Sequence, residues 1–131
     1  MLLVAYELQQ NRLATEAQTR ADISYMVFEG LQAWADNPTL MQALEKEENG
    51  EALTYKEMLI LTYSQAGEMR RWENTYYQYE RGLFSEAEFV GMQKQWRSRI
   101  NSSAFQSYWN EERMTFYSEG FAKLIRSLIN E

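Results

Sequence analysis

Residues 2–35 form one stretch without proline, and its apolar side chains recur at the spacing of an α-helix. The stripe expected to face inward comprises Leu13, Ala17, Ala21, Ser24, Phe28, Leu31 and Ala35, widened by Ile23, Val27 and Trp34. A helix of this length is about 51 Å long. A compact chain of 131 residues has a diameter of roughly 36 Å. A straight first helix therefore has to overhang the body of the protein.

The rest of the chain also carries helix signals and no alternating strand pattern. Proline, capping boxes and stop signals predict further helices at about 38–48, 54–81, 85–100 and 102–113, and from 118 onward. Gly30, Gly67 and Gly91 fall inside predicted helices and mark either close helix crossings or kinks. We expect an all-α fold with a single domain over residues 1–131. It is an irregular bundle of about six helices with a long first helix.

The composition excludes several kinds of chemistry. The chain has no Cys and no His, which rules out disulfides, thiol nucleophiles, imidazole bases and metal sites that contain these ligands. The acidic segment at 45–51 lacks the ligand pattern of an EF-hand. A net charge of −6 disfavours nucleic acid as a partner. We predict that the protein is not an enzyme and has no catalytic residue, metal site or cofactor.

One carboxylate stands out as a candidate site. Helical spacing places Glu73 on an aromatic face, near Tyr76 and Tyr77. A buried carboxylate needs a partner, and Arg70 is within reach three residues earlier. Arginines of other helices are alternative partners: Arg97, Arg99 or Arg113. We predict that Glu73 is buried, is paired with an arginine and belongs to a polar hub made of Glu73, Arg70, Asn74, Tyr77 and Gln78. The alternative is a catalytic or ligand-binding acid.

Three segments, in this order, carry a family resemblance: residues 4–12 (VAYELQQNR), 71–83 (RWENTYYQYERGL) and 109–121 (WNEERMTFYSEGF). They resemble an uncharacterised family of small bacterial proteins with an N-terminal transmembrane helix followed by a helical domain. The middle helix of that family has a pattern like F-E-N-x-Y-Y-Q-Y-x-x-G-L. The resemblance implies a helical domain tethered to the bacterial inner membrane. It implies no known activity.

The first residues allow two interpretations. Residues 1–6 are apolar, far fewer than the 18 or so that a membrane span needs. Residues 1–12 are either the end of a truncated membrane-anchoring helix or an ordinary N-terminus packed on the domain. Arg12 and Arg20 follow the presumed span, which favours a domain that faces the cytoplasm. The chain as given is expected to be soluble.

These observations favour a non-enzymatic helical interaction module that is membrane-tethered in full-length relatives. The alternative is a ligand-binding or sensory domain with a Tyr/Trp-lined pocket near Glu73. The overhang of the first helix would leave Leu2, Leu3, Val4 and Tyr6 in water. We therefore expect a homodimer that pairs first helices, unless the helix bends back or frays before Glu7.

Overall fold

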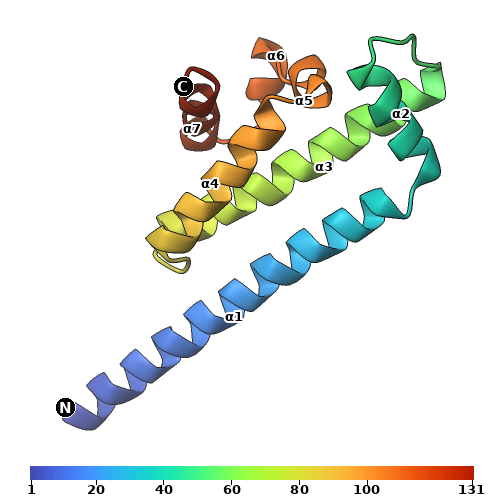
Figure 1. Ribbon diagram of the computed structural model, residues 1–131. Coiled ribbons are helices and arrows are strands. Elements are labelled where there is room, and N and C mark those ends of the chain that lie inside the picture. The colour runs from blue at the N-terminus through green and yellow to red at the C-terminus, as the bar shows by residue number, and fades with distance from the viewer.

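The computed structural model describes residues 1–131 and contains helices and no strand (Figure 1). The helices are α1 (Leu2–Ala35), α2 (Pro38–Glu48), α3 (Tyr55–Glu80), α4 (Glu86–Ile100), α5 (Ser103–Tyr108), α6 (Glu111–Met114) and α7 (Glu119–Ile129). This confirms the predicted all-α irregular bundle with a long first helix. The one helix expected at 102–113 is two short ones, because the backbone is extended at Trp109 and the Asn110 side chain caps a new helix.

Local signals set most helix ends. Thr54 and Glu57 form a complete capping box at the start of α3, as predicted. The second predicted box is half formed. Ser85 accepts a hydrogen bond from the Glu88 backbone N–H, but the Glu88 carboxylate binds the Ser85 hydroxyl rather than its backbone N–H. The turns that follow α2 and α3 both contain a glycine at positive φ, a conformation that other residues rarely adopt.

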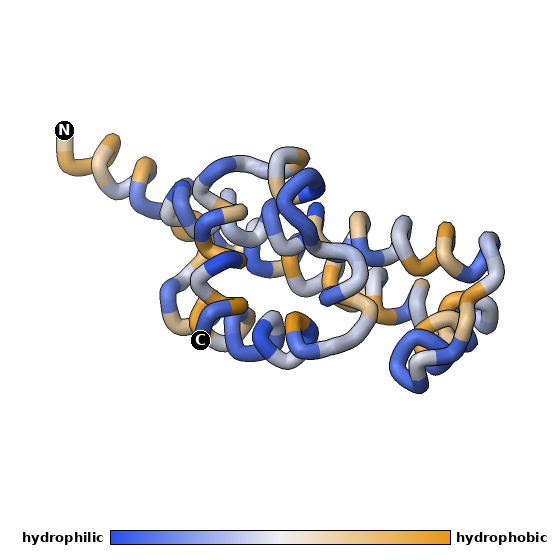
Figure 2. The backbone as a smooth tube through the Cα atoms, turned by 90° about the horizontal axis from the view of Figure 1, so that it is seen from above, coloured by the Kyte–Doolittle hydropathy of each residue, from blue (hydrophilic) through white to orange (hydrophobic).

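Helix α3 lies at the centre of the fold (Figure 1). Helix α1 runs antiparallel to it on one side, and α4 with α5, α6 and α7 covers the other side. Helix α2 packs on the N-terminal end of α3. The N-terminal part of α1 extends past the other helices in both views (Figures 1 and 2). The overhang expected from the length of α1 is therefore present.

The core is rich in aromatic side chains. Trp72 of α3 stacks on Trp96 of α4 with ring centroids 4.9 Å apart, and Phe121 of α7 meets the Trp96 ring edge-on. Met69 and Ile125 are also fully buried. The arrangement ties α3, α4 and α7 into one unit. A smaller apolar cluster, made of Leu40, Ala43, Leu61 and Ala104, joins α2, α3 and α5.

The predicted inward stripe of α1 is correct only for the three residues that widen it: Ile23 is buried, and Val27 and Trp34 are half-buried. The other seven residues are exposed: Leu13, Ala17, Ala21, Ser24, Phe28, Leu31 and Ala35. The bundle instead contacts the side of α1 that carries Ile23, Gly30 and Trp34. At about 100° per residue, the centres of these two sides are about 115° apart around the helix, so they are neighbouring faces. We name the outward-facing set the α1 stripe.

The first fifteen residues of the chain are also exposed throughout, and the helix neither bends back nor packs its N-terminus on the domain. In Figure 2 this end is coloured partly as hydrophobic, in keeping with Leu2, Leu3 and Val4. None of the helices unites the length and the apolar character that crossing a bilayer requires.

Candidate functional site

The carboxylate of Glu73 links two helices. Its Oε1 accepts a hydrogen bond from Nη1 of Arg70 at 2.8 Å, and its Oε2 accepts one from the backbone N–H of Ser118 at 2.7 Å. Ser118 is the N-cap of α7, and its own side chain makes no capping bond. Glu73 therefore takes over the role of a capping group at the start of α7. The Arg70 guanidinium lies over the ring of Tyr117, 4.6 Å from its centroid.

The predicted polar hub is smaller and less buried than expected. The Glu73 side chain retains 20% of its exposure, because it lies at the edge of the contact between α3 and α7. Asn74 and Tyr77 are exposed, and the Tyr77 hydroxyl accepts a hydrogen bond from Arg81. Gln78 is half-buried and makes no side-chain hydrogen bond. The structure brings together Glu73 and Arg70 but not the other three residues.

The hollow beside Glu73 differs from the predicted pocket. It has a volume of about 410 Å³ and includes Tyr76 and Tyr77 but no tryptophan. The tryptophans gather on another side of α3. There a hollow of about 360 Å³ lies between α1, α3 and α4, and we name it the tryptophan pocket. Its apolar walls include Trp34, Trp72 and Trp96.

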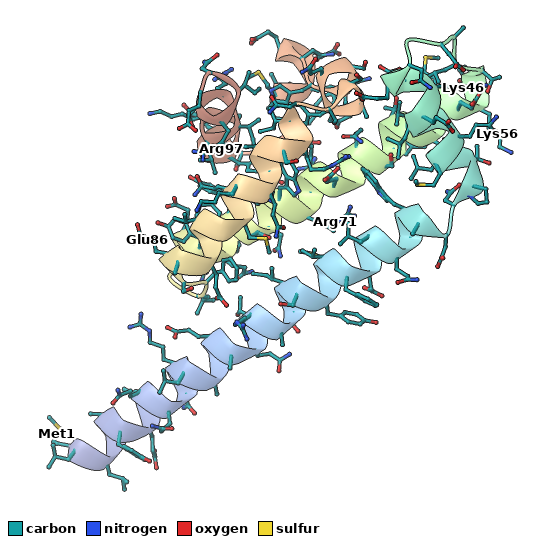
Figure 3. The ribbon with its side chains drawn as sticks, in the orientation of Figure 1. Met1, Lys46, Lys56, Arg71, Glu86 and Arg97 are labelled. Carbon is teal, nitrogen blue, oxygen red and sulfur yellow. The ribbon has the colours of Figure 1, made fainter.

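Three charged side chains line the tryptophan pocket: Glu68, Arg71 and Arg99. Arg99 donates two hydrogen bonds to the Glu68 carboxylate, at 3.2 Å and 3.3 Å. Its guanidinium also lies 4.7 Å from the centroid of the Trp34 ring. Figure 3 places Arg71 on α3, between that helix and α1. The sequence alone did not indicate that these three charged side chains line one pocket. The one local signal is Gly30, which packs on Arg71.

Other buried polar groups have structural roles. Glu57 accepts hydrogen bonds from Lys46 and from the Thr54 backbone, and these bonds hold the pKa of its carboxyl below the ordinary value. The hydroxyls of Tyr108 and Tyr117 are 2.7 Å apart inside the core. Burial raises the pKa of Tyr117, and its hydrogen bond with Tyr108 acts in the same direction. Tyr117 therefore stays neutral at physiological pH, and its hydrogen bond with Tyr108 joins α5 to the segment before α7.

Comparison of this chain with family models, with curated proteins and with solved structures finds no match. The resemblance to a bacterial, membrane-tethered family therefore stays a prediction that rests on the motifs alone. Within the fold, no three acidic side chains gather in a way that could hold a metal ion. Two features are left for a functional interpretation: the α1 stripe and the tryptophan pocket.

Proposed function

We propose that the protein is a non-enzymatic helical interaction module that pairs with a second copy of itself through the α1 stripe. The observation that supports this is the exposure of the whole stripe on a helix that is otherwise fixed to the bundle at Ile23, Gly30 and Trp34. A stripe with helical period is typical of a buried helix face. Within one copy of the chain, the stripe borders the segment between α3 and α4 at Leu13 and Ala17, and all of its residues stay exposed.

The stripe fits a second α1 helix. Its residues are spaced three and four apart, as in the seam between two packed helices. Ala17 and Ala21 in the middle let two backbones approach closely, and Leu13 and Phe28 supply larger side chains on either side. Leu3 and Tyr6 continue the same spacing into the overhang. A second copy therefore covers the apolar overhang as well.

The size of the contact is at the lower limit for a biological interface. A helix face about 50 Å long and about 10 Å wide offers about 500 Å² per copy. Two copies then bury about 1,000 Å², which is close to the minimum for a biological interface and typical of a weak dimer. The bundle contacts a neighbouring face of α1, about 115° around the helix, and the stripe residues stay exposed beside it. The same patch on both copies is what a two-fold dimer requires.

The test uses two matched double variants of the whole chain. Leu13→Lys with Phe28→Lys introduces two charges into the stripe. Thr15→Lys with Ala33→Lys introduces the same two charges at exposed positions on the side of α1 opposite the stripe. All four positions are exposed in the single chain, so neither variant should disturb the bundle. Circular dichroism checks that both variants remain helical.

Light scattering at micromolar concentration measures the mass. We expect the original chain and the Thr15/Ala33 variant to have twice the mass of a single copy of 15.6 kDa. The Leu13/Phe28 variant should be monomeric. A monomeric original chain, or a Leu13/Phe28 variant that is still dimeric, would contradict the proposal.

A further inference from the structure

The guanidinium of Arg71 is held in the tryptophan pocket by a close approach between two helices. A Cβ atom on Gly30 of α1 would lie 2.7 Å from both Cζ and Nε of Arg71, so only glycine leaves room for the guanidinium in this position. Glycine inside a helix costs about 1 kcal/mol relative to alanine. Gly30 therefore lowers the stability of α1 and leaves the space that the guanidinium occupies.

Arg71 differs from the other arginines of the chain in having no partner. Six of the others form ion pairs with a carboxylate. The remaining two donate hydrogen bonds, Arg81 to the Tyr77 hydroxyl and Arg113 to the Tyr108 carbonyl. The Arg71 side chain is half-buried and makes no ion pair or hydrogen bond within the protein. A half-buried charge without a partner is unfavourable, and a bound anion would remove that cost.

The pocket around Arg71 is otherwise neutral and largely apolar. The charges of Glu68 and Arg99 compensate each other in their ion pair, so one positive charge is left over. Its apolar lining residues are Val27, Leu31, Trp34, Trp72, Met92 and Trp96, although Trp72 and Trp96 are almost fully buried. A volume of about 360 Å³ is within the range of small-molecule sites. The pocket thus combines one unpaired cation with an apolar lining.

We propose that the tryptophan pocket binds a small monocarboxylate with an aromatic or aliphatic body. The carboxylate pairs with the planar fork of the Arg71 guanidinium, whose geometry matches two carboxylate oxygens. The apolar body lies against the apolar lining, which includes Val27, Leu31 and Trp34. A single remaining charge favours one carboxylate over a doubly charged group. This site shares Leu31 with the α1 stripe, whereas Leu13 and Phe28, the positions changed in the dimer test, do not line it.

Calorimetric titration of the whole chain with two naphthalene compounds tests the assignment. Naphthalene-2-carboxylate carries the charge, and naphthalene-2-carboxamide has the same shape without it. We expect the carboxylate to bind with a submillimolar dissociation constant. The carboxamide should bind with a dissociation constant that is higher by about tenfold or more. Raising the salt concentration should weaken the binding of the carboxylate and leave the binding of the carboxamide unchanged. Absence of heat with the carboxylate at millimolar concentration, or equal affinity for the two compounds, would overturn the proposal.

Two variants locate the contact. Arg71→Met keeps the length of the side chain and removes the charge, and Arg126→Met is the matched control on the exposed face of α7. Gly30→Ala leaves Arg71 in place but pushes its guanidinium aside. We expect Arg71→Met and Gly30→Ala to weaken carboxylate binding about tenfold or more. Arg126→Met and the Leu13/Phe28 variant should bind as the original chain does. Unchanged affinity in both Arg71→Met and Gly30→Ala would reject Arg71 as the anion contact.

Discussion

Gln65 is the most deeply buried polar side chain of the protein, and replacing it with methionine should stabilise the fold. Only 1% of Gln65 is exposed, and neither Nε2 nor Oε1 has a hydrogen-bond partner. Both atoms therefore lose their bonds to water on folding and gain none within the protein. Methionine has the same unbranched length and a similar helix propensity, so Gln65→Met removes the polar atoms without changing the packing much.

The expected gain follows from the cost of burying an unpaired amide. An unsatisfied buried donor or acceptor costs about 1–3 kcal/mol. Removing the amide should therefore raise the free energy of unfolding by about that amount. For a chain of this size, 1 kcal/mol corresponds to about 4 °C in the unfolding midpoint. Gln65→Met should thus raise the midpoint by about 4–12 °C.

Thermal unfolding followed by circular dichroism measures this shift, with all proteins at one concentration because dimerisation would add to the midpoint. Gln42→Met is the matched control, since Gln42 is exposed on α2 and its replacement should change stability by less than about 0.5 kcal/mol. A midpoint that is unchanged or lower in Gln65→Met would show that the amide is satisfied, and the reasoning would fail.

Two further predictions concern carboxylates that join elements. Glu73→Ala should cost about 1–2 kcal/mol in urea unfolding, because it removes the bond to the Ser118 backbone and an ion pair that is partly exposed. Glu73→Gln, which keeps an acceptor, should recover part of that loss, and equal losses in the two variants would contradict the capping role. Because the folded pKa of Glu57 is below its ordinary value, its stabilising effect is present above that value and is lost as the pH falls through the folded pKa. The original chain should therefore lose more stability than Glu57→Gln between about pH 5 and pH 3, and parallel pH profiles would refute this.

The helix boundaries could be predicted because their causes are local. Pro38 and Asn37 start α2 through contacts within a few residues, and Thr54 with Glu57 does the same for α3. The break at Trp109 escaped prediction, because the residues around it also have acceptable helix propensities. Its extended backbone places Tyr108 and Tyr117 together in the core, which is a tertiary contact.

The outward orientation of the α1 stripe could not be predicted, for a different reason. Periodicity shows that one face of a helix is suited to burial, but it does not say what buries it. Helix α1 has two usable faces, and the bundle takes the one with Ile23 and Trp34, where Gly30 permits a close approach to α3. The choice depends on the fit between two helices far apart in sequence.

In the candidate sites, too, the local contacts could be predicted from the sequence and the tertiary contacts could not. The pairing of Glu73 with Arg70 follows from helical spacing, and the sequence suggested it. The contact of Glu73 with Ser118 joins residues that are far apart in sequence, so only the fold reveals it. Arg71 stands next to Arg70 in the sequence and points toward another helix, where the isolation of its charge depends on all of the neighbouring elements.

The exposure of the first fifteen residues of α1 has an energetic consequence for assembly. A helical segment of that length without tertiary contacts is marginal in water, so the free chain exchanges between helix and coil at this end. In the proposed dimer, pairing of two copies has to order these turns, and the entropy of ordering is subtracted from the association energy. The affinity of the proposed dimer is thereby coupled to intrinsic helix propensity. A substitution that touches no contact, but favours coil at the N-terminal end, should weaken assembly as surely as one in the seam.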